Sequence, residues 1–182
     1  MDAGPDAELV RRSLSGDPEA FGELVGAYQK VLYNVALRMV NDREDAEDLV
    51  QTAFLKAYRA LHTYDPRHKF FSWIYRILTN EALNLLQRRR PQEEVSERLA
   101  SEERPPDDCC HEREIGEIVR RGLMELSTDH RQVLILRHLL HQSHRDIGEA
   151  LGLPEKTVKS RLYTARQLLA VVLRRRGIGP TS

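Results

Sequence analysis

Cysteines are scarce and long apolar runs are missing, which limits the kinds of protein that this sequence can encode. Among its 182 residues the only cysteines are Cys109 and Cys110, and adjacent cysteines cannot join distant elements of one chain by a disulfide. No apolar stretch approaches the roughly 20 residues that span a bilayer, and residues 1–6 lack the basic and apolar regions of a signal peptide. We therefore expect a cytoplasmic protein with a buried core and room for two small domains.

Net charge is also missing, but the charges are segregated along the chain. Residues 1–50 carry five Lys or Arg against eleven Asp or Glu, and residues 51–90 carry eight against two. Residues 91–118 carry three against ten, and residues 119–182 carry twelve against five. The two basic blocks predict two separate surfaces for phosphates, whereas the acidic blocks are expected to face other proteins or solvent.

Signatures of catalysis and metal binding are nearly absent. We find no nucleophile triad, phosphate-binding glycine loop or paired-carboxylate cleft, and we expect neither an enzyme nor a cofactor. The run Cys109, Cys110, His111 and Glu112 leaves the alternative of a metal or redox sensor. Adjacent cysteines rarely reach one ion together, so inert linker thiols are the favoured interpretation and no metal site is predicted.

The C-terminal third has the pattern of a helix-turn-helix. Ser143 and Asp146 have capping-box spacing, which predicts that a short helix begins there. Gly152 can end this helix in the left-handed conformation, and Pro154 suits the first turn of a second helix. Gly148 is expected to leave room for that second helix to pass close.

The second helix of this pattern has an apolar and a polar face. Val158, Leu162 and Ala165 recur at helical spacing and predict its buried face. The opposite face offers hydrogen-bond donors and positive charge, which suits the major groove of DNA, although an ordinary solvated face would look similar. That face is formed by Lys156, Ser160, Tyr163 and Gln167, flanked by Thr157, Lys159 and Arg161.

Apolar periodicity predicts helices through most of the remaining chain, and hence an all-α fold. Helices are expected over residues 17–40, 43–62, 70–90, 115–126 and 128–140, with the first two packed antiparallel. The last must cover the helix-turn-helix, whose small helices cannot form a core alone.

An acidic stretch without periodicity separates two predicted domains. Residues 91–111 include adjacent prolines and are expected to form a flexible linker. The two small helical domains would then occupy residues 1–90 and 112–176, and residues 177–182 would be a disordered tail.

Two further features favour binding to macromolecules. Leu55 lies among polar neighbours on the outer face of the helix over residues 43–62, which fits the centre of a protein interface as well as an ordinary exposed leucine. Aromatic and basic side chains interleave over residues 70–90. Their rings could stack on unpaired bases beside arginines that meet the DNA backbone, or they could belong to the core.

These stretches together resemble one protein family. A resemblance to region two of bacterial sigma factors is carried by residues 45–59, D-A-E-D-L-V-Q-T-A-F-L-K-A-Y-R, and 70–90, F-F-S-W-I-Y-R-I-L-T-N-E-A-L-N-L-L-Q-R-R-R. A resemblance to region four is carried by residues 153–166, L-P-E-K-T-V-K-S-R-L-Y-T-A-R. With only these two regions around a linker, the chain resembles the extracytoplasmic-function (ECF) group of the sigma-70 family.

The resemblance implies a protein that binds the clamp helices and flap of core RNA polymerase, directs it to promoter DNA and promotes melting. It also implies an anti-sigma factor, which could hold the protein at the membrane. Polymerase contacts would come from Asp45, Asp48, Leu49, Gln51, Thr52 and Leu55. The minus-10 element, with a base flipped from the duplex, would meet Lys69, Phe70, Trp73, Arg76, Asn80, Asn84 and Arg88.

The same resemblance assigns the helix-turn-helix to the minus-35 element, read from the major groove with two residues near phosphates. This set is His144, Arg145, Lys156, Thr157, Lys159, Ser160, Arg161 and Tyr163. The alternative is a stand-alone helix-turn-helix regulator, which would have no use for the outer face around Leu55.

Overall fold

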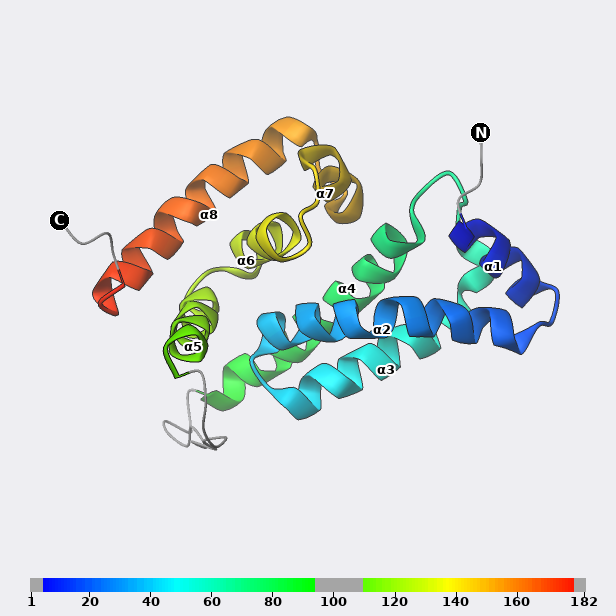
Figure 1. Ribbon diagram of the computed structural model, residues 1–182, viewed down its shortest axis with the longest axis horizontal. Coiled ribbons are helices and arrows are strands. Elements are labelled where there is room, and N and C mark those ends of the chain that lie inside the picture. Colours follow the sequence, from blue (N-terminus) through cyan, green and yellow to red (C-terminus); the bar gives the residue numbers. More distant parts are fainter. Residues whose placement is uncertain (1–4, 94–109, 179–182) are drawn as a thin grey trace.

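The computed structural model describes residues 5–93 and 110–178, and every regular element in these ranges is a helix (Figure 1). The predicted all-α class is confirmed. Most of the predicted linker and the end of the predicted tail, at residues 94–109 and 179–182, lie outside the described residues. The elements are α1 (Pro5–Leu14), α2 (Pro18–Val40), α3 (Arg43–Arg59), η1 (Leu61–Thr63), α4 (Phe70–Glu93), α5 (Cys110–Met124), α6 (Thr128–Leu134), the π-helical turn η2 (Ile135–Leu139), α7 (His144–Leu151) and α8 (Glu155–Arg175).

Local capping sets the α2–α3 hairpin as the sequence predicts. The Asp17 carboxylate accepts hydrogen bonds from the backbone amides of Glu19 and Ala20, and α2 starts at the following proline. The helix ends at Asn41, whose φ of 59° is left-handed, and Asp42 then caps α3. With only two residues between them, α2 and α3 lie antiparallel in Figure 1.

Helix α1 is not predicted by the apolar periodicity. It depends on contacts with α2: Val10 is buried, and the Tyr28 hydroxyl donates to the Asp6 carboxylate at 2.6 Å. Three helix boundaries also differ from the expected ones: α5 begins at Cys110, inside the predicted linker and before the expected start at residue 115, and two helix ends are shifted. Helix α3 stops at Arg59 and is followed by the 3-10 turn η1, whereas α4 runs on to Glu93.

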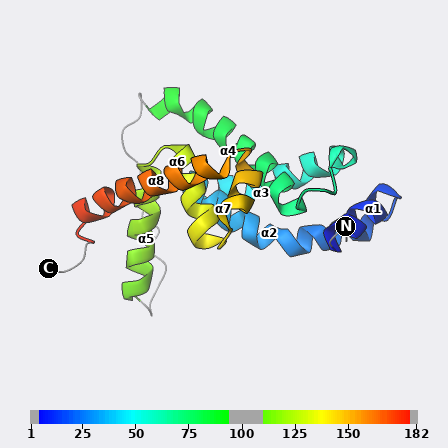
Figure 2. The same ribbon diagram turned by 90° about the horizontal axis from the view of Figure 1, so that it is seen from above.

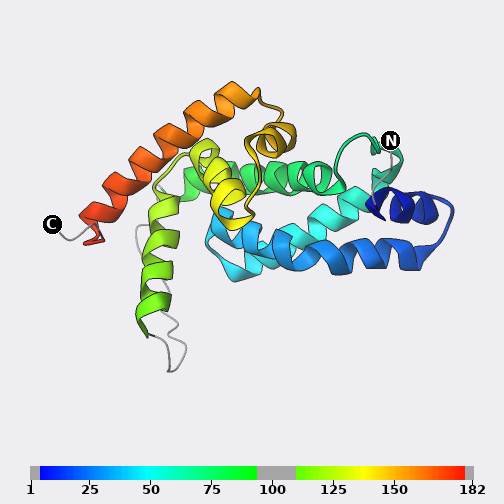
Figure 3. The same cartoon turned by 45° about the horizontal axis from the view of Figure 1, so that its top comes forward.

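The helices form two lobes, each contiguous in sequence (Figures 1 and 3). In the N-terminal lobe, α1 to α4, the helices α2, α3 and α4 pack on one another around side chains such as Leu32, Phe54 and Leu78. In the C-terminal lobe, α5 to α8, the long helix α8 crosses the lobe and packs on α5, α6 and α7 (Figure 2). The lobes touch mainly where α7 meets α4 and where α5 and α6 meet α2.

A buried arginine holds the base of the C-terminal lobe. Arg131, only 5% exposed, donates to the carbonyls of Leu123, Met124 and Leu126 at the end of α5. It also donates across the lobe boundary to the carbonyl of Met39 near the end of α2. The Leu123 carbonyl also accepts from the Leu126 amide at 3.1 Å. The other three carbonyls lie at or just beyond helix ends, where intrahelical partners are missing, so the guanidinium satisfies groups that burial would leave unpaired. Burial lowers the pKa of Arg131 to about 10, so the side chain remains charged at neutral pH.

Candidate nucleic-acid and polymerase interfaces

The helix-turn-helix forms as its local sequence predicts. The Ser143 hydroxyl accepts from the Asp146 amide at 3.1 Å, while the Asp146 carboxylate accepts from the Ser143 amide at 3.3 Å. These two bonds make the capping box that starts α7. Gly152 ends α7 with a φ of 66°, and Pro154 lies at the N-cap of α8, one position before the first turn.

Gly148 lies where the turn and the start of α8 pass close to α7. A Cβ atom at this position would lie 2.6 Å from the carbonyl oxygen of Leu153 in the turn and 3.9 Å from the amide nitrogen of Glu155, the first residue of α8. The Leu153 amide in turn donates to the Gly148 carbonyl at 2.9 Å. The close approach of the second helix expected at Gly148 is thus present at the start of α8, and the tightest contact comes from the turn before it.

Helix α8 presents the predicted polar face to solvent. Val158, Leu162 and Ala165 are buried in the C-terminal lobe, whereas Tyr163 on the other side is 67% exposed. Arg161 is half-buried and lies 3.1 Å from the Asp129 carboxylate of α6. Of the predicted minus-35 residues, Arg145, Lys156, Lys159, Ser160 and Tyr163 are exposed, and His144, Thr157 and Arg161 are half-buried.

Helix α4 carries a second polar row. Arg76, Asn80, Asn84 and Arg88 are all exposed and follow one another at intervals of four, which places them along one side of the helix. Lys69, also exposed, immediately precedes the first turn. The predicted minus-10 residues with polar side chains therefore share a surface.

The aromatic residues at the start of α4 divide between core and surface. Phe70 is fully buried, with its ring centroid 5.6 Å from those of Tyr28, Tyr64 and Trp73. Tyr75 is also fully buried, and burial raises the pKa of its hydroxyl. Phe70 and Tyr75 are therefore core residues in this arrangement, whereas Trp73 is only half-buried.

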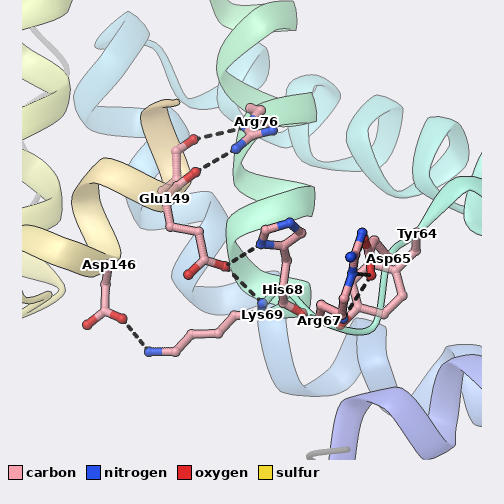
Figure 4. A network of polar contacts seen from close by, with 9 residues as sticks. Tyr64, Asp65, Arg67, His68, Lys69, Arg76, Asp146 and Glu149 are labelled. Carbon is pink, nitrogen blue, oxygen red and sulfur yellow. Dashed lines mark hydrogen bonds and ion pairs between the residues drawn. The ribbon is translucent and has the colours of Figure 1, made fainter. Parts of the chain in front are cut away.

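Tyr64 in the preceding loop is a neighbour that sequence reasoning missed. Its hydroxyl donates to the His68 carbonyl at 2.6 Å, which ties the two ends of the loop before Lys69 (Figure 4). Burial, with smaller effects from nearby carboxylates, raises the pKa of Tyr64 to about 12. The loop that precedes the polar row is therefore ordered by an aromatic side chain from its own start.

The outer face of α3 forms an apolar patch within a polar surrounding. Leu55 is 60% exposed and Tyr58 is 55% exposed, one helical turn apart. Tyr58 also packs edge-to-face on Phe21 of α2, at a centroid distance of 4.9 Å. Sequence reasoning found Leu55 but missed Tyr58, although its three-residue spacing from Leu55 was a readable signal.

The other predicted polymerase residues are not equally accessible. Asp48 and Gln51 are exposed, and Leu49 is buried in the lobe. Asp45 is half-buried and forms a bidentate ion pair with Arg89 of α4, with nitrogen-to-oxygen distances of 2.5 and 2.7 Å. Thr52 is half-buried as well.

The predicted minus-10 surface of α4 meets helix α7 of the helix-turn-helix at the lobe boundary. Figure 4 shows Lys69 and Arg76 of the α4 surface turned toward Asp146 and Glu149 of α7. The Lys69 ammonium lies 2.6 Å from the Asp146 carboxylate. Nothing in the sequence pattern pointed to this contact, because the partners are 77 residues apart.

Metal-binding clusters and membrane-spanning helices are both absent from the part of the chain that the structure describes. There, no three His, Cys, Asp or Glu side chains gather as they would around a metal ion. The side chains of Cys109 and Cys110 lie outside this description, so the predicted inert thiols stay a prediction. Among the described helices none combines the length and apolar character needed to cross a membrane.

Sequence comparison matches both lobes to families of one kind. The family model for Sigma-70 region 2 matches residues 24–92, and the model for Sigma-70, region 4 matches residues 116–169. The ECF RNA polymerase sigma-E factor of Escherichia coli (strain K12) is 34% identical over 176 residues, covering 90% of this chain and 92% of the relative.

Solved structures share the fold across both lobes. CnrH, solved in complex with the cytosolic domain of CnrY, has a TM-score of 0.73 and 29% identity, covering 96% of this chain and 99% of CnrH. The sigma factor RpoE from Bartonella quintana, solved with the anti-sigma factor NepR, has a TM-score of 0.67 and covers 85% of this chain and 96% of its own. At 24% identity, the second likeness shows the fold alone.

Proposed function

The chain belongs to the ECF sigma factors of the sigma-70 family, transcription initiation factors that direct RNA polymerase to promoters, and we propose that it divides this work among three surfaces. The polar row of α4 would contact the minus-10 element. The exposed face of α8 would read the minus-35 element, and the outer face of α3 would bind core polymerase. None of these roles calls for catalysis by the chain itself.

The observation that carries the proposal is the presence of two separate polar helix faces with positive charge, one on each lobe. Arg76 and Arg88 mark the row on α4, and Lys156 and Lys159 mark the face of α8. The face of α8 fits the major groove, where side-chain donors meet phosphates and base edges, and the row on α4 fits the backbone of a melted strand. Two such faces on one chain suit a promoter with two elements.

The patch of Leu55 and Tyr58 supports binding to polymerase. Exposed large apolar side chains that are surrounded by polar groups are typical of the centre of a protein interface. A stand-alone helix-turn-helix regulator would have no use for this patch, which lies on the lobe without the helix-turn-helix. The sigma-factor assignment is therefore favoured over that alternative.

An anti-sigma factor is the expected regulatory partner. The structural relative CnrH, at 29% identity, was solved in complex with the cytosolic domain of CnrY. Because this chain would bind RNA polymerase and promoter DNA, we expect it to act in the cytoplasm. An anti-sigma factor in the membrane could hold it there in an inactive complex. Co-purification of the tagged protein from cells would identify this partner.

Transcription in vitro tests the proposal directly. Core polymerase, the purified protein and genomic DNA should give transcripts from a defined set of start sites that share two upstream elements. Failure to give any specific transcript, while a known sigma factor works in parallel, would contradict it.

A matched pair of variants tests the polymerase surface. Leu55→Asp should weaken association with core polymerase by at least about tenfold, because a charge is placed at the centre of the interface. Leu14→Asp alters another exposed leucine, on α1, and should leave association unchanged. Equal effects of the two substitutions would remove the case for α3.

A further inference from the structure

We propose that this chain inhibits itself, because α7 of the helix-turn-helix covers the cations with which α4 would meet the minus-10 element. The inference rests on the proposed function of α4. In this proposal Asp146 and Glu149 do not contact DNA. Their carboxylates bind groups of the N-terminal lobe that would otherwise contact DNA.

The first contact is electrostatic. The Lys69 ammonium pairs with the Asp146 carboxylate at 2.6 Å, and the Lys69 backbone amide donates to the Glu149 carboxylate at 3.1 Å (Figure 4). His68 Nδ1 lies 3.4 Å from the same Glu149 oxygen. Lys69 lowers the pKa of Asp146, which keeps that carboxylate ionised. Two carboxylates thus occupy positions that phosphate oxygens of bound DNA would need.

The second contact uses the end of α7. The Arg76 guanidinium donates to the carbonyls of Glu149, at 2.5 Å, and Ala150, at 3.3 Å. Both carbonyls belong to the last turn of α7, where helix carbonyls have no intrahelical partner and carry the negative end of the helix dipole. Arg76 therefore caps α7, and it cannot give the same N–H groups to a phosphate while it does so.

The covering of the α4 cations by α7 is partial, as expected of a contact that can open, and we call this contact the latch. Asn80, Asn84 and Arg88, further along the same row, are exposed. The Lys69 side chain is 59% exposed, and solvent and salt weaken pairs of this kind. At the other lobe contact, Arg131 would lose only its bond to Met39 if the lobes separated, because its remaining carbonyl partners belong to its own lobe.

Zero-length crosslinking tests closure without any assay of function. A carbodiimide couples an amine to a carboxylate that touches it, and the products are identified by mass spectrometry. Lys56 and Glu81 lie 2.6 Å apart within the N-terminal lobe and provide an internal control at the same distance. We expect both the Lys56–Glu81 and the Lys69–Asp146 crosslinks within monomers. The first without the second overturns the latch.

Opening the latch tests inhibition. The variant D146N/E149Q removes both charges, and asparagine keeps an oxygen able to accept the capping bond from Ser143. Binding to random-sequence single-stranded DNA of about 12 nucleotides is measured by fluorescence anisotropy. Affinity should rise about threefold to tenfold at low salt, with a smaller gain at high salt. The matched variant E117Q/E125Q, also on the C-terminal lobe, should show no gain.

The outcomes separate the inference from the function on which it rests. No gain by D146N/E149Q over E117Q/E125Q, with the Lys69–Asp146 crosslink present in the parent protein, overturns self-inhibition alone. Adding K69A and R76A to the open variant should abolish the gain. If those substitutions leave DNA binding unchanged, the proposed role of α4 fails, and the inhibitory role of α7 fails with it.

Discussion

Helices α4 and α8 carry similar side chains but differ in how accessible their polar faces are. The proposed recognition face of α8 is open to solvent, whereas the first turns of α4 are engaged by α7 of the other lobe. Both faces combine arginine or lysine with small polar residues at helical spacing. Composition therefore identifies surfaces suited to DNA, but only the packing of the lobes shows which of them is free to bind.

The largest expected effect is a difference in stability between variants of two arginines, Arg131 and Arg76. Both donate to helix-end carbonyls at the lobe boundary. Arg131→Met should lower the free energy of unfolding by about 3 kcal/mol, because it leaves buried carbonyls without partners. Arg76→Met, at an exposed position, should cost less than about 1 kcal/mol. Urea denaturation followed by circular dichroism measures both. If both substitutions lower the free energy of unfolding by similar amounts, the Arg131 contacts do not stabilise the protein more than the Arg76 contacts.

Gly148→Ala should cost about 2 kcal/mol, since its Cβ would meet the Leu153 carbonyl oxygen at 2.6 Å. Duplex binding through α8 should fall with it. Gly26→Ala in α2 is the control: a Cβ there meets nothing within 4 Å, so the change should stabilise by about 0.5–1 kcal/mol. Thermal unfolding compares the two, and a stabilising Gly148→Ala would contradict the described turn.

Salt dependence compares the two faces directly. Lys156→Ala should weaken duplex binding by about 1 kcal/mol and reduce the slope of log affinity against log salt by about one. Lys69→Ala should change single-stranded DNA binding less in the free protein, because its ammonium is already paired, than in the polymerase complex. If Lys69→Ala weakens single-stranded DNA binding equally in the free protein and in the polymerase complex, α7 does not cover α4 in the free protein.

The smallest expected effect is a loss of stability at high pH through Tyr64. The folded state raises the pKa of this hydroxyl from 10.0 to about 12, so its stabilising contribution is complete below pH 10 and declines as pH rises through 12. Tyr64→Phe should therefore reduce the slope of unfolding free energy against pH in this window. An unchanged slope would mean that the Tyr64 hydroxyl is not buried beside these carboxylates as described.

Local signals predicted the helix-turn-helix and the α2–α3 hairpin well. Ser143, Asp146 and Gly152 act on backbone within a few residues, as do Asp17 and Asn41, so their effect can be read from short windows. Sequence could not supply contacts that arise between distant segments. Helix α1 relies on packing against α2, and the ion pair of the lobe boundary joins residues 77 positions apart.

The candidate sites were predicted less completely than the fold. Residue type marks Phe70 as suitable for stacking on a base, but only tertiary structure shows its ring enclosed by those of Tyr28, Tyr64 and Trp73. Tyr58 lies beside Leu55 on the same helix face and was missed because aromatic residues are usually assigned to the core.

The contiguity of each lobe has a consequence for synthesis on the ribosome. All of α4 emerges before α7 is translated, so the nascent chain has an N-terminal lobe whose Lys69 and Arg76 still lack their partners. A newly made chain therefore passes through a stage in which nucleic acid can reach these cations. That stage ends once the segment containing Asp146 and Glu149 has left the exit tunnel and folded.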